Sequence, residues 1–123
     1  MSHVVHVQTE IRDVQALQAA CQRLHLKPPV LETVELFSGQ ATGYAVRLPA
    51  WKYPAVCHVE TGTVEFDNYG GRWGQQCELD NLLQAYSVEK TRIEARKHGH
   101  TVTEQSLADG SVKLTLQVGG VAL

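Results

Sequence analysis

The feature of this sequence that most constrains its fold is an alternation of apolar and polar residues that returns in several segments. In the first of them, Val5 and Val7 lie on the side of an extended chain opposite His6. Such alternation predicts strands with one face on a core. Thr61-Gly62 and Asp109-Gly110 are pairs typical of hairpin turns, and short turns join antiparallel strands. The alternating segments are 3–11, 30–39, 42–49, 54–71 and 112–118.

Two other segments have the helical period instead. Asp13 is placed to cap the first turn of a helix whose apolar stripe runs to Leu24. The prolines at 28 and 29 end that helix, because proline has no amide hydrogen to donate. A longer helix is expected over 77–98, with Gly99 as the left-handed residue that follows its last turn.

The predicted order of elements is β-α-β-β-β-β-α-β-β, which indicates an α+β fold. We expect two helices on one face of a mainly antiparallel sheet of about seven strands. The chain has 123 residues, 43% of them hydrophobic, which fits one compact domain over residues 1–118. Residues 119–123 are expected to be a flexible C-terminal tail, because Gly119-Gly120 follow the last strand. The tail has two alternative roles: a peptide offered to a partner such as an unfoldase pore, or a ubiquitin-like diglycine exposed after trimming.

Composition narrows the class of protein. The formal net charge is -2, whereas proteins that bind nucleic acids usually carry a basic excess, so nucleic acid is an unlikely partner. Three cysteines without a CxxC pair favour a reducing compartment. No apolar run approaches the roughly 20 residues that cross a bilayer, and the first residues lack a signal-peptide pattern. The sequence therefore predicts a cytoplasmic protein without a membrane segment.

A few side chains could carry metal or thiol chemistry. His98, His100, His58 and Cys57 are residue types that ligate zinc. Cys57 and His58 point to opposite faces of a strand, however, and are not expected to share one ion. We therefore expect His98 and His100 to belong to a basic helix end and Cys57 to be buried, with no metal and no cofactor. Cys77 is the candidate reactive thiol, since amide dipoles at a helix start lower the pKa of a thiol. No catalytic constellation is recognisable, and we expect no enzyme.

Aromatic residues gather in two loops. The stretch "FDNYGGRWGQQ" holds Tyr69, Arg72 and Trp73, and "PAWKYP" holds Trp51 and Tyr53. Trp, Tyr and Arg are the side chains that most often anchor protein interfaces. We predict that these five form a partner-binding surface. For Trp73 the competing role, capping the core beneath the second helix, is weighted above recognition; for Trp51 recognition is weighted higher.

The chain resembles, nearly end to end, the family catalogued as domain of unknown function 1257, a hypothetical chloroplast reading frame shared with bacteria. The motifs that carry the resemblance are "MSH" with "TEIRD", "LFSGQATG", "FDNYGGRWG", "LQAYSVEKTRIEARKHGHTV" and "LADGSVKLTLQ". It is more similar to the non-photosynthetic bacterial members than to the chloroplast branch. The resemblance implies no activity or catalytic residue. Bacterial members lie beside genes for AAA-type ATPases, so it implies a companion of such an ATPase.

The sequence thus favours a non-enzymatic binding or adaptor protein with a protein partner. One alternative is a small metal-binding protein or enzyme that uses the His and Cys residues, and a further alternative is a sheet that binds single-stranded RNA. We also expect a homo-oligomer formed through a sheet edge. The reason is that the last strand carries a single charge, Lys113, and so protects an edge poorly.

Overall fold

The computed structural model describes residues 5–7 and 10–118. The predicted order of strands and helices is confirmed, with one short 3-10 turn, η1, added before the long helix. The elements are β1 (Val5–Val7), α1 (Val14–Arg23), β2 (Val30–Leu36), β3 (Gly39–Val46), β4 (Ala55–His58), β5 (Thr63–Phe66), η1 (Tyr69–Gly71), α2 (Gln76–Lys97), β6 (Thr101–Ser106) and β7 (Val112–Gln117).

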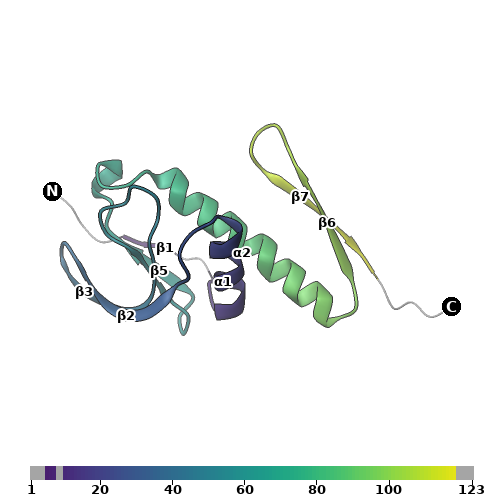
Figure 1. The fold of residues 1–123 in the computed structure, drawn as a ribbon, viewed down its shortest axis with the longest axis horizontal. Coiled ribbons are helices and arrows are strands. Elements are labelled where there is room, and N and C mark those ends of the chain that lie inside the picture. The colour runs from purple at the N-terminus through teal and green to yellow at the C-terminus, as the bar shows by residue number, and fades with distance from the viewer. Residues whose placement is uncertain (1–4, 8–9, 119–123) are drawn as a thin grey trace.

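The strands form two antiparallel sheets. Five of them pair in the order β1-β5-β4-β3-β2, and β6 and β7 pair only with each other. The expectation of one sheet of about seven strands was therefore wrong. The reason lies in α2, whose 22 residues span about 33 Å and carry the chain beyond the sheet. Figure 1 shows β6 and β7, which we call the ribbon, beside α2 and away from the sheet.

Both helices cover one face of the sheet, as expected. Tyr44, Cys57 and Val64 lie opposite one another on β3, β4 and β5 and point to that face. Leu17 of α1 and Leu82 of α2 pack in the same cluster, and both are fully buried. This cluster is the main core, and its apolar burial is the largest source of stability in the molecule.

The other face of the sheet carries a second, smaller apolar cluster. Ala45 and Val56 lie opposite each other in the register and point away from the helices. Tyr53, from the loop before β4, packs against this cluster. The cluster consists of Val34, Leu36, Ala41, Ala45 and Val56, all buried.

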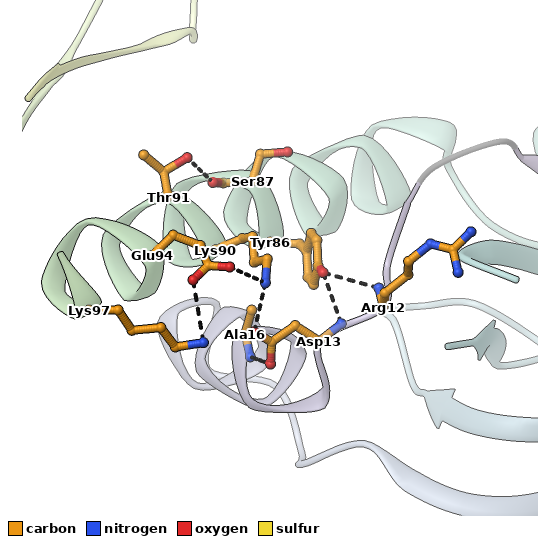
Figure 2. Close-up of polar contacts among 9 residues, drawn as sticks. All are labelled: Arg12, Asp13, Ala16, Tyr86, Ser87, Lys90, Thr91, Glu94 and Lys97. Atoms are coloured by element: carbon orange, nitrogen blue, oxygen red, sulfur yellow. Dashed lines mark hydrogen bonds and ion pairs between the residues drawn. The ribbon is translucent and has the colours of Figure 1, made fainter. Parts of the chain in front are cut away.

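Polar contacts fix the two helices to each other (Figure 2). The Tyr86 hydroxyl accepts the backbone amides of Arg12 and Asp13, both at 3.1 Å. The Asp13 carboxylate caps α1 by accepting the Ala16 amide, as predicted, and also accepts the Lys90 ammonium at 3.0 Å. Burial acts to raise the pKa of Asp13, but the hydrogen bond from Lys90 and the capping amide outweigh it and lower that pKa. These groups satisfy one another's hydrogen bonds, so we assign them a structural role in joining the start of α1 to α2.

Neither α1 nor α2 combines the length and the apolarity that crossing a bilayer needs. At its far end α2 stops as predicted, with Gly99 in the left-handed region at φ 74°.

Candidate interaction surface

Trp73 is the centre of a cluster of aromatic rings and cations. Its ring stacks on Tyr69 with centroids 4.8 Å apart and meets the edge of Tyr53 at 5.6 Å. Phe37, which directly follows β2, lies 5.4 Å from it. Together with the cations of Lys52 and Arg72, these rings form a group that comes from three separate loops. We call it the aromatic surface; it comprises Phe37, Lys52, Tyr53, Tyr69, Arg72 and Trp73.

The loop before α2 holds Trp73 in place through backbone geometry. Gly70 and Gly71 have φ of 61° and 99°, a region that glycine enters without strain. The resulting turn lets the Trp73 amide donate to the Asn68 carbonyl at 2.9 Å. The Trp73 carbonyl in turn accepts the Lys52 amide at 2.8 Å. This last bond joins the two aromatic loops, so the rings on both are presented together.

Two cations complete the aromatic surface. The Lys52 ammonium lies 4.4 Å from the centroid of the Trp73 ring and 5.5 Å from that of Tyr53. The Arg72 guanidinium carbon lies 5.3 Å from the Tyr69 centroid. Both Lys52 and Arg72 are exposed. Cations at such distances are attracted by the negative face of a ring, which holds them in place without cancelling their charge.

Trp51 lies in the same loop as Tyr53 but has a different environment. Its ring packs against the edge of Phe66 at 5.7 Å, and its indole Nε1 donates to the Gln75 carbonyl at 3.0 Å. A Cβ on Gly74 would lie 2.4 Å from the Trp51 ring, so only glycine leaves room for it there. It is therefore Trp51, rather than Trp73, whose side chain caps the core at the start of α2.

Of the five predicted surface residues, the structure brings together Tyr53, Tyr69, Arg72 and Trp73. Sequence reasoning missed Phe37 and Lys52. Phe37 had a signal, since a large aromatic in a hairpin turn is not needed for the turn; in the structure Phe37 is 57% exposed. Lys52 had none, because its contact with Trp73 joins positions that are distant in the sequence.

The histidines and Cys57 do not converge. Cys57 is buried on the helix-covered face, whereas His58 points the other way, with its Nε2 2.9 Å from a Glu65 carboxylate oxygen. The rings of His98 and His100 stack with centroids 6.2 Å apart. Among the residues that the structure describes, no three side chains of metal-ligating type come together.

The three thiols differ in environment. Cys77 is exposed, and its Sγ donates to the Gln75 side chain at 3.5 Å. Cys21 and Cys57 are buried in the main core. Burial raises the pKa of Cys21 to about 11 and, with a smaller contribution from Cys21, that of Cys57 to about 12. Only Cys77 is accessible to a reagent.

Asp67, which precedes the aromatic loop, is a buried acid. It is fully buried, and neither carboxylate oxygen has a hydrogen-bond partner in the described part of the chain. Its neighbour Asn68 is also buried but donates to the Gly74 carbonyl at 3.2 Å. A buried carboxylate without a partner costs stability.

Comparisons with protein-family models, curated proteins and solved structures give no match for this chain. The resemblance to the family domain of unknown function 1257 stays a prediction from the motifs quoted above.

Proposed function

We propose that the protein is a non-enzymatic binding or adaptor protein and that the aromatic surface contacts a protein partner. The observation that carries this proposal is the position of Trp73 among rings from three loops, with two exposed cations held over them. Half-buried tryptophan and tyrosine rings beside an exposed arginine match the composition of interface hot spots, which are enriched in Trp, Tyr and Arg.

The surrounding structure supports this role. Tyr53 packs on the second apolar cluster of the sheet, and this contact holds the ring of Tyr53 in position. Beside Arg72 lies a hollow of about 330 Å³, lined by Pro49, Ala50, Gly71 and Gly74 among others, which could receive a side chain of a partner. Gln75 and Glu78 also line the hollow, so small residues and polar side chains share its walls, a mixture that suits contact with a partner side chain.

The test is a comparison of partners captured by the wild type and by Trp73→Ala. We expect a partner that binds the wild type to be lost with Trp73→Ala and kept with Val30→Ala, which truncates an exposed apolar side chain at the start of β2 instead. Circular dichroism establishes that both variants are folded. A partner retained by Trp73→Ala, or lost equally with both variants, would contradict the assignment.

We further propose that the partner is an AAA-type ATPase, in keeping with the genes beside bacterial members of the family that the chain resembles. The test is direct binding of a purified ATPase encoded beside the gene for this protein. We expect complex formation on size exclusion with the wild type and none with Trp73→Ala. Equal binding of the ATPase by the wild type and by Trp73→Ala would show that the ATPase does not bind through the aromatic surface.

We also propose self-association through a strand edge. The last described strand, β7, lies in a two-stranded ribbon, and Leu116 and Val118 at its end are 51% and 63% exposed. Large exposed apolar side chains beside a strand edge that pairs with no other described strand favour pairing with a second copy. Light scattering should give a mass above the 13.6 kDa of one chain at micromolar concentration, and a constant 13.6 kDa would contradict the proposal.

A further inference from the structure

We propose that the aromatic surface recognises an acidic peptide segment, in which carboxylates flank an apolar side chain. This inference rests on the proposed function and names the chemistry of the partner. It starts from the two cations of the surface, Lys52 and Arg72, and from the exposed ring of Phe37.

Most other cations of the protein are already neutralised by its own carboxylates. Lys52 and Arg72 have no such ion pair within residues 5–7 and 10–118 and contact aromatic rings instead. Lys27, Arg96 and Lys113 also lack an ion pair there, but none of them lies over a ring. The cations that do pair with a carboxylate are Arg12, Arg23, Arg47, Lys90, Arg92 and Lys97.

Contact with a ring positions a cation while leaving its charge available. The ammonium of Lys52 is held over Trp73, so little side-chain entropy is lost when a carboxylate binds it. A guanidinium near a ring keeps its N–H donors, which fit both oxygens of a carboxylate. Lys52 lies over Trp73 and Arg72 over Tyr69, and these two rings stack on each other, so a partner with two or more carboxylates could meet both cations.

The apolar part of the ligand follows from Phe37. Its side chain is 57% exposed while it contacts Trp73, so it offers uncovered apolar area next to the cations. A leucine or tyrosine of the partner would cover it. Burial of that area, at about 25 cal/mol per Å², would add affinity that charge alone does not supply.

A peptide fits these observations better than a nucleic acid. Proteins that bind nucleic acids usually neutralise many phosphates, whereas this surface offers two cations on a chain of net charge -2. In addition, Tyr69 already stacks on Trp73 with an interplanar angle of 27°, which occupies ring area that a base would need.

The experiment uses the full chain and three fluorescent peptides of about twelve residues. In one, Asp and Glu alternate with Leu and Tyr; in the others, Gln or Lys replaces the acids. The two tryptophans supply an internal control in NMR spectra. We expect the acidic peptide to shift the indole signal of Trp73 and to leave that of Trp51, which is bonded to the Gln75 carbonyl, unchanged.

The charge assignment is tested with matched variants. Lys52→Gln with Arg72→Gln should weaken binding of the acidic peptide by about tenfold or more, and raising NaCl from 50 to 500 mM should weaken it similarly. Lys27→Gln with Arg96→Gln removes the same charge elsewhere and should change the affinity less than about twofold.

Several results would overturn the inference. They are equal binding of the Gln peptide, preference for the Lys peptide, equal loss in both double variants, or tighter binding of oligothymidine than of the acidic peptide. The proposed function fails separately. If Trp73→Ala loses the protein partner while Lys52→Gln with Arg72→Gln keeps it, the surface assignment stands and only the acidic partner class is wrong.

Discussion

The five-stranded sheet and the ribbon consist of antiparallel strands of similar length, yet different interactions stabilise them. In the sheet, Val64 is fully buried between the helices and the strands, together with Leu17 and Leu82. In the ribbon, Leu116 keeps 51% of its surface exposed. Both regions alternate apolar and polar residues, so alternation alone does not produce a core. A second layer must cover the apolar face.

Hydrogen bonds and ion pairs attach the ribbon to the helices, whereas apolar burial stabilises the sheet. The Glu104 carboxylate accepts hydrogen bonds from Arg23 of α1 and, at 2.9 Å, from Arg92 of α2. At the other end, the Gln84 side chain donates to the Gly110 carbonyl at 3.1 Å. The ribbon is therefore attached at few points, and partly exposed ion pairs are worth little each. We expect the ribbon to open before the sheet does.

The largest expected effect is a loss of core packing. Leu82→Ala removes a fully buried side chain and should lower the free energy of unfolding by about 2–5 kcal/mol. Leu116→Ala in the ribbon should change it by less than about 0.5 kcal/mol at concentrations where the protein is monomeric. Denaturant titration measures both. A large loss with Leu116→Ala would mean that a second copy covers the ribbon, in line with self-association.

The thiols compare the core with the surface in one experiment. In the native protein Cys77 should react with a thiol reagent at least about a hundredfold faster than Cys21 and Cys57, whose raised pKa values and burial disfavour the thiolate. Mass spectrometry of the labelled peptides measures this, with the denatured chain as control. Labelling of all three at one rate would show that the core opens readily.

The packing of Trp51 at the start of α2 is tested by Gly74→Ala. The added methyl would lie 2.4 Å from the Trp51 ring and force it to move, so we expect a loss of about 1–3 kcal/mol. In a Trp51→Leu background the same change should cost less, since the clash is removed. Equal losses in both backgrounds would mean that Trp51 does not cause the effect.

Asp67 should respond in the opposite direction. Because its buried side-chain oxygens have no hydrogen-bond partner among the described residues, Asp67→Leu should remove the cost of burying unpaired polar atoms and raise stability by about 1 kcal/mol. Thermal unfolding measures the change. A decrease would show instead that the carboxylate has a stabilising partner, such as a bound water or cation.

The smallest effect concerns the attachment of the ribbon. The hydrogen bond from Arg23 is the main reason that the pKa of Glu104 is below its ordinary value of 4.5. A lowered folded-state pKa means that the stabilisation is complete above the unfolded value and is lost as pH falls through the folded value. Glu104→Gln removes the same negative charge at pH 7. It should lower the free energy of opening the ribbon by about 0.5–1 kcal/mol.

Hydrogen exchange of ribbon amides measures this loss. Protection should fall in β6 and β7 with Glu104→Gln, remain in the sheet, and be unchanged in the control Glu60→Gln, whose side chain lies on the surface. If protection falls equally in both regions, the ribbon and the sheet unfold as one unit, and the contrast between them is not one of stability.

Most of the fold could be predicted because the elements depend on neighbouring residues. The hairpin turns at Thr61-Gly62 and Asp109-Gly110 both contain a glycine with positive φ, as expected for tight turns. What could not be predicted is that β6 and β7 do not join the sheet. Strand pairing is a contact between segments that can be distant in the sequence. The same alternation would allow β6 and β7 to pair with the sheet or only with each other.

The candidate site divides in the same way. The sequence by itself determined that Asp13 caps a helix and that Gly99 ends one, because both effects involve atoms within a single turn of the chain. It also determined that two aromatic loops exist. Only the tertiary structure decided that Trp51 packs on Phe66 and that Trp73 joins Lys52 at the surface. The physical reason is that the burial of a side chain depends on what covers it, and here the covering atoms come from remote positions in the chain.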